Sequence, residues 1–249
     1  MNEKSNPAFR SIVVGEETAS SEYSGERATY GGISLKTFLC FLLSIATGVA
    51  ALFIPVKLLY VLLIIGPIAA FISAMIGIRS LKAAMPCSII YSMAEGLSLG
   101  VITALCDAVY PGIASAAILA TITVFGVSLF FYATGLVRAS GRMRKFVLIS
   151  LVTIMVISLV ATIASFFGNF VLAELFYGYG LVSILVSIFC VFVAAFCLII
   201  DFDDAASVVR GGADKRYEWV SALGLMVSII YLYYQILRIL IILFANNRD

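Results

Sequence analysis

The stretch "LVSILVSIFCVFVAAFCLIIDFDD" (Leu181–Asp204) decides the fold class of this chain. Its first twenty residues contain no Asp, Glu, Lys or Arg, and three aspartates follow within the next four positions. A helix of about 20 apolar residues is long enough to cross the hydrocarbon core of a bilayer. The run therefore predicts a transmembrane helix over residues 181–200 that ends at a membrane surface.

Six other runs have the same length and character, and the sequence is consistent with seven spans in total. They cover residues 33–54, 58–78, 84–106, 112–137, 146–167 and 219–244. None has the alternating pattern of a membrane β-strand, so helices must satisfy the backbone hydrogen bonds. Short connections favour antiparallel neighbours in one bundle. We expect an all-α integral membrane protein with a polar cytosolic tail (residues 1–32) and a seven-helix transmembrane domain (residues 33–249).

The composition supports the membrane class and excludes several activities. Of 249 residues, 63% are hydrophobic and 12% are charged, whereas about 25% are charged in typical soluble domains. The net charge of +2 gives no electrostatic basis for nucleic-acid binding. The chain has no histidine, which excludes Ser–His and Cys–His catalysis and histidine-ligated zinc. Its five cysteines lie in apolar runs without CxxC spacing. We expect no enzymatic activity and no cofactor.

The distribution of Lys and Arg predicts the orientation, because cytosolic loops of membrane proteins are enriched in these residues. Thirteen of the 16 fall on the side of the N-terminus. They are Lys4, Arg10, Arg27, Lys36, Arg79, Lys82, Arg138, Arg142, Arg144, Lys145, Arg210, Lys215 and Arg216. The others are Lys57, Arg238 and Arg248. We expect a bacterial inner (plasma) membrane protein with a cytosolic N-terminus and, after an odd number of spans, an external C-terminus.

Glu95 lies at the middle of the third span, where an ionisable side chain is costly and usually faces the bundle interior. Three- and four-residue spacing places Ser88, Tyr91, Ser92 and Ser98 on the same helical face. Two interpretations are open. Glu95 is either a protonated group that hydrogen-bonds a neighbouring helix, or part of an ion pathway.

Asp201 is the acid closest to the hydrocarbon at the end of the sixth span. An acid at a helix C-terminus opposes the helix macrodipole, so we expect a cation beside it. Arg79 and Lys82 follow the second span at the same predicted depth. We therefore predict a latch between Asp201 and Arg79 or Lys82 that protonation would weaken, whereas Asp203 and Asp204 are interpreted as solvated helix-end acids.

The seventh span carries a polar face formed by Ser221, Gly224, Ser228, Tyr231, Gln235 and Arg238, spaced by three and four residues. Gly224 and Ser228 are typical of close helix packing, but Gln235 and Arg238 exceed what packing requires. This face favours a central position for the helix, with snorkelling as the alternative interpretation of Arg238. Carboxylates are also the ligands that Ca²⁺ prefers, and Glu95 and Asp201 are predicted to bind it weakly and transiently.

Several segments resemble the bacterial branch of the Bax inhibitor-1 family. They are "LIIDFDDAASVVRGGADKRYEWVSALGLMVSIIYLYYQILRILIIL" (residues 198–243), "AEGLSLG" (residues 94–100) and "NPAF" (residues 6–9). The resemblance implies six helices around a central seventh, and a pH-sensitive calcium leak channel or calcium/proton exchanger. It also implies that Asp201 belongs to a pH sensor latched by Arg79, with Lys82 as the second choice.

One feature of that sensor is missing from this sequence. The resemblance places a second aspartate near Val227 or Ser228, and neither residue is acidic. Glu95 and Glu218 are the candidates for the missing acid.

Two functions therefore remain open. The first is a Ca²⁺ pathway through the bilayer along Glu95, Ser228, Gln235, Arg238 and Glu218. The second is a non-transporting regulator that binds another membrane protein, such as a quality-control protease. The Ca²⁺ pathway is the leading hypothesis. The incomplete acid pair favours the regulator somewhat, and measurement of Ca²⁺ flux separates the two.

Overall fold

The computed structural model describes residues 26–246 except Arg138, and does not describe the side chains of residues 56, 57, 59 and 60. The first 25 residues of the predicted tail therefore lie outside the described part of the chain. So do Lys4, Arg10, Arg138, Arg248 and the side chain of Lys57, which entered the orientation prediction.

Eight helices form in the described residues, and seven of them are long and apolar enough to cross a membrane. Their bounds are α2 (Tyr30–Ala51), α3 (Val56–Arg79), α4 (Ala84–Val109), α5 (Ile113–Ala133), α6 (Gly141–Phe166), α7 (Val171–Tyr177), α8 (Leu181–Arg210) and α9 (Tyr217–Asn246). Residues 26–246, Arg138 aside, contain no strand, only an isolated bridge between Arg27 and Asp214. The all-α class with seven membrane-crossing helices is confirmed. The short helix α7 was not predicted.

Helices α6 and α8 extend furthest beyond the spans that hydropathy marked. Helix α6 begins at Gly141 because the Ser140 side chain accepts a hydrogen bond from the Met143 amide, at 3.2 Å. Helix α8 continues to Arg210 and is about 45 Å long, compared with about 30 Å for the hydrocarbon core. Asp201 thus lies inside a helix. The prediction that it opposes a helix terminus was wrong, because the helix continues through the polar surface layer.

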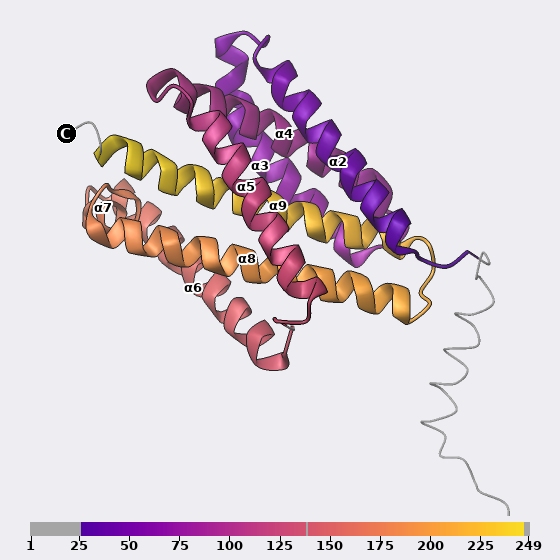
Figure 1. Cartoon of the computed structure of the whole chain (residues 1–249). Helices are drawn as coiled ribbons and strands as arrows, with labels where there is room; N and C mark the ends of the chain where they lie inside the picture. Colours follow the sequence, from indigo (N-terminus) through magenta and orange to yellow (C-terminus); the bar gives the residue numbers. More distant parts are fainter. Residues whose placement is uncertain (1–25, 138, 247–249) are drawn as a thin grey trace, which may run out of the picture.

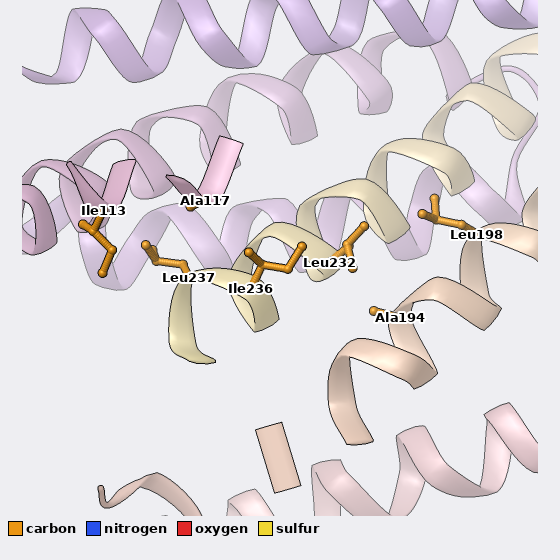
Figure 2. Close-up of a cluster of buried hydrophobic side chains, with 7 residues drawn as sticks. All are labelled: Ile113, Ala117, Ala194, Leu198, Leu232, Ile236 and Leu237. Atoms are coloured by element: carbon orange, nitrogen blue, oxygen red, sulfur yellow. The ribbon is translucent and has the colours of Figure 1, made fainter. Parts of the chain in front are cut away.

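Helix α9 packs against α2, α3, α4, α5 and α8 (Figure 1). Its side chains join α5 and α8 in one buried cluster (Figure 2). The cluster consists of Ile113, Ala117, Ala194, Leu198, Leu232, Ile236 and Leu237. Helix α6 packs against α7 and α8. The arrangement of six helices around the C-terminal one therefore stays a prediction.

Glycines allow α2 and α4 to approach backbone to backbone. A Cβ added at Gly100 would lie 2.6 Å from the Cα of Gly48, and one added at Gly96 would lie 2.8 Å from the Cα of Ser44. Small residues at helix contacts permit this approach in membranes. The two glycines of "AEGLSLG" thus serve packing and hold Glu95 against the rest of the bundle.

Candidate functional site

Asp201 projects from α8 toward α9. Its carboxylate faces the Ser228 hydroxyl, and its Oδ1 is 4.0 Å from the position that a Cβ on Gly224 would take. Its Oδ2 is buried and has no hydrogen-bond partner. The position at which the family resemblance places a second aspartate is thus occupied by a hydroxyl that faces the first.

The predicted latch of Asp201 with Arg79 or Lys82 is not formed. None of the ion pairs found in the described ranges includes Asp201, and both basic side chains are exposed. The main packing partners of α8 are α2, α5, α6, α7 and α9, rather than α3. The prediction was wrong because matching depth does not bring two helices side by side.

Arg144 forms ion pairs with two of the three acids of α8, Asp203 and Asp204. Its Nη2 lies 2.8 Å from Oδ2 of Asp203 and 2.7 Å from Oδ1 of Asp204. The Arg210 guanidinium is 3.7 Å from Asp203 on the same helix. Because Arg144 lies in the first turn of α6, this contact joins α6 to α8 and leaves Asp201 without a direct cationic partner.

Four side chains of α9 lie on one face and, with Asp201, form what we name the α8–α9 polar seam. They are Ser228, Tyr231, Gln235 and Arg238. Ser228 and Gln235 are buried. Tyr231 and Gln235 interact electrostatically without reaching hydrogen-bond geometry. The seam extends about 15 Å along α9, from Ser228 to Arg238.

The seam contains all the buried, unpartnered side-chain polar atoms of the described residues. They are Asp201 Oδ2, Tyr231 OH, Gln235 Oε1 and Arg238 Nε. A buried polar atom without a partner costs about 1–3 kcal/mol, so such atoms generally mark ordered water or an ion. The seam therefore concentrates the buried polar atoms that lack a partner in the described residues.

Arg238 closes one end of the seam against α7. Its guanidinium lies 4.8 Å from the ring centre of Phe176 and 5.0 Å from that of Tyr177, and its Nη2 donates to the Phe176 carbonyl. Cation–π contacts of this kind hold a guanidinium in place. Arg238 is therefore fixed by α7, and sequence reasoning missed this because α7 was not predicted.

Glu95 lies outside the seam, in contact with the adjacent face of α9. Its Oε2 accepts a hydrogen bond from the Tyr234 hydroxyl, at 3.3 Å. Tyr234 is six residues beyond Ser228, which separates Glu95 from Asp201 by about 9 Å along α9. The described residues contain no group of three or more Cys, Asp or Glu side chains arranged to hold a metal ion.

The polar stripe on α4 is largely satisfied within its own helix. The Ser88 hydroxyl donates to the Ala84 carbonyl at 2.7 Å, and the Ser92 hydroxyl donates to the Ser88 carbonyl at 2.8 Å. Serine hydroxyls bonded in this way have little capacity left for a ligand. These serines therefore fit a packing role, and Glu95 is the one acid of the stripe.

Glu218 belongs to a separate structure, which we name the Glu218 clasp (Thr29, Lys36 and Glu218). Its Oε1 accepts from the Thr29 amide at 2.8 Å and from the Thr29 hydroxyl at 3.1 Å, and its Oε2 lies 2.6 Å from Lys36 Nζ. The Lys36 ammonium also lies 5.1 Å from the Trp219 ring centre. Because both carboxylate oxygens are engaged, Glu218 does not act as the second acid beside Asp201.

The clasp joins the start of α2 to the start of α9. A Cβ on Gly32 would overlap the Glu218 carboxylate, so a side chain at that position would have to displace it. Hydrogen bonds from the Ala28 amide to the Ala213 carbonyl (2.8 Å) and from the Lys215 amide to the Glu26 carbonyl (3.1 Å) extend the junction. The acid in the first turn of α9 was the only sequence signal for it, since carboxylates stabilise helix N-termini.

Comparison with known proteins assigns the chain to a family. The family model described as Bax inhibitor 1 like matches residues 6–245, which is nearly the whole chain. None of the curated proteins with which the chain was compared matches it. The assignment to a bacterial branch stays a prediction.

Proposed function

We propose that this chain, which belongs to the Bax inhibitor-1 family, is a slow, pH-sensitive leak pathway or proton-coupled exchanger for Ca²⁺. The pathway follows the α8–α9 polar seam, and Asp201 is its ionisable group. The observation that carries this proposal is the set of four buried, unpartnered polar atoms along the seam.

Packing against lipid or a partner protein does not require buried polar atoms without hydrogen-bond partners. In a bilayer, unsatisfied polar groups are more costly than in water-soluble proteins, and the ones that persist generally line water-filled paths. The unpartnered atoms include a carboxylate, a phenol and an amide oxygen, which all accept from water or bind a cation. A file of waters along α9 would supply their missing partners.

Asp201 is suited to a passing cation rather than a resident one. Ca²⁺ requires six to eight oxygen ligands for tight binding, and Asp201 with Ser228 supplies few. When Asp201 is ionised, it attracts the cation. When it is protonated, that attraction is lost and the new O–H faces the Ser228 hydroxyl. Asp204, Arg144 and Cys197 are the other titratable or charged groups that interact with Asp201.

Arg238 makes the pathway slow. Its positive charge lies at the end of the seam toward α7, where it repels a divalent cation. A positive side chain in a pore is a known kind of electrostatic barrier. We therefore expect a slow Ca²⁺ leak rather than rapid conduction.

The remaining features are proposed on the same basis. The protein carries out no chemistry and needs no cofactor, and its partners are the lipid bilayer and Ca²⁺. We place it in a bacterial inner membrane with a cytosolic N-terminus and an external C-terminus, which the distribution of Lys and Arg supports.

Flux into liposomes tests the proposal. Purified protein is reconstituted into vesicles that contain a calcium dye, and Ca²⁺ entry is followed from pH 5 to pH 8. We expect wild-type flux above that of empty vesicles, and loss of most of this flux in Asp201→Asn. Asp203→Asn is the matched control, because it removes the same charge from the same helix but outside the seam.

Equal flux in protein-containing and empty vesicles at every pH would overturn the proposal. The non-transporting regulator, which binds another membrane protein, would then be the better function. Equal loss of flux in the Asp201 and Asp203 variants would leave transport in place but remove the seam as its route.

A further inference from the structure

Two hollows lie between α2 and α5, on a side of α9 away from the polar seam. Their volumes are about 540 Å³ and 640 Å³, and both are lined by Phe41, Thr121, Ile122 and Ile229, so they form one continuous groove. The main contacts of α2 are with α4, α8 and α9, and those of α5 are with α4, α8 and α9. In Figure 1, α5 crosses in front of α9, and α2 lies to the right of α5. The groove therefore has α2 and α5 as walls, and α9 with parts of α4 and α8 as its floor.

The groove offers apolar surface and few polar groups that need a ligand. Phe38 and Phe41 of α2 face Phe125 and Leu129 of α5 across it, and Ile229 lies on its floor. Three of the hydroxyls along it are bonded within the protein. Thr37 donates to the Ile33 carbonyl at 2.9 Å, Thr121 donates to the Ala117 carbonyl at 2.7 Å, and Thr103 pairs with Tyr233 at 2.8 Å. An occupant must therefore be apolar and elongated.

One end of the groove changes in character. The phenols of Tyr30 and Tyr132 lie there, and Tyr132 interacts electrostatically with Asp203 and Arg210, which face each other on α8. The Arg210 side chain is 65% exposed, its Nε donates to the Ala206 carbonyl at 3.2 Å, and its Nη2 lies 3.7 Å from Asp203. Phenols and a guanidinium at a membrane surface suit a phosphate group above an apolar chain.

We propose that the groove between α2 and α5 holds one acyl chain of a bilayer phospholipid, with the lipid phosphate near Arg210. Both walls are membrane-crossing helices, so the phase that meets the opening between them is lipid. Each hollow falls within the range of volumes, about 300–1,000 Å³, that ligand sites occupy. Contact with the packed aromatic side chains favours burial of the acyl chain. The exposed Arg210 supplies the positive charge complementary to the phosphate.

Photo-crosslinking tests the acyl chain. The probe is phosphatidylglycerol with a diazirine in one acyl chain, reconstituted with the full-length protein, and the labelled peptides are identified by mass spectrometry. Ile229 lies on the floor of the groove and is half-buried, so label on it reports an acyl chain that enters the groove. We expect label on the α9 peptide that contains Ile229 in the wild type.

Two tryptophan variants on α5 make the test specific. Ile122 lines both hollows and is 57% exposed, so Ile122→Trp should fill the groove and abolish labelling of α9. Leu119 lies three residues earlier, is 68% exposed and lines neither hollow, so Leu119→Trp should leave the labelling unchanged. Size-exclusion profiles establish that both variants fold.

Retention of lipid in detergent tests the phosphate contact. Arg210→Gln should lower the amount of phosphatidylglycerol that copurifies, whereas Arg142→Gln, which removes the same charge elsewhere on the same face of the membrane, should not. Labelling confined to outward-facing residues such as Leu148, unchanged labelling of α9 in Ile122→Trp, or labelling of α9 by a diazirine fatty acid alone would overturn the proposal. None of these outcomes depends on Ca²⁺ flux.

Discussion

Replacing Lys36 with methionine should destabilise the protein far more than replacing Lys215, although the two lysines make ion pairs of equal length. Lys36 lies 2.6 Å from Glu218, with side chains 14% and 2% exposed. Lys215 lies 2.6 Å from Glu26, with side chains 52% and 66% exposed. Burial is therefore the variable that separates the two pairs.

The magnitude follows from what each substitution leaves behind. Lys36→Met leaves the Glu218 carboxylate buried, with the Thr29 amide and hydroxyl as its remaining partners. Removing one partner of a buried ion pair costs about 3–5 kcal/mol. For a domain of this size, 1 kcal/mol lowers Tm by about 2–4 °C, so we expect a decrease of about 6–20 °C. The Glu26 carboxylate raises the pKa of Lys215, but water screens this exposed pair. The pair should therefore contribute no resolvable stability.

Thermal unfolding in a mild detergent is the assay, with Lys36→Met, Glu218→Gln, the double variant and Lys215→Met measured side by side. The double variant should recover part of the loss, because glutamine leaves no unpaired charge. Equal decreases in Tm for Lys36→Met and Lys215→Met would contradict this prediction, since burial of the ion pair would then make no difference. So would a double variant whose loss is the sum of the single losses.

Three further predictions concern the pathway and the packing. Arg238→Gln should raise the Ca²⁺ leak about tenfold, corresponding to about 1.4 kcal/mol of barrier, while Arg238→Lys keeps the charge and should keep the flux low in the dye assay. Wild-type Ca²⁺ flux should fall as pH is lowered, because protonation of Asp201 removes the negative charge that attracts the cation. In Asp201→Asn the remaining flux should not vary with pH. A pH profile of the same shape in both proteins would contradict the role of this carboxylate. Gly100→Ala should destabilise the protein by about 1–3 kcal/mol because its Cβ would meet the backbone of Gly48. Gly126→Ala, where a Cβ meets nothing within 4 Å, should leave Tm unchanged or raise it, and the same result at both glycines would rule out the close approach.

The sequence was sufficient for the fold class because membrane helices satisfy their hydrogen bonds within each span. Twenty residues without a charge, as in 181–200, leave the backbone no other solution in lipid. Because hydropathy is a property of each local segment, it did not predict where α8 ends. Hydropathy marks where a helix leaves the hydrocarbon, but α8 continues ten residues past that point.

Residue types also indicated the site in part. A carboxylate or an arginine in an apolar span is rare, and Asp201, Glu95 and Arg238 stood out for that reason. The spacing on α9 placed Ser228, Gln235 and Arg238 on one face, and the four unpartnered atoms lie along it.

Which groups meet depends on how the helices pack against one another. The rotation and packing of whole helices place Arg144, rather than Arg79, beside the acids of α8, and join Lys36 to Glu218 across 182 residues. They also leave the groove between α2 and α5. Spacing along one helix determines which side chains share its face. The neighbour of that face depends on many weak contacts made at once by every other helix, and no local stretch of sequence contains them.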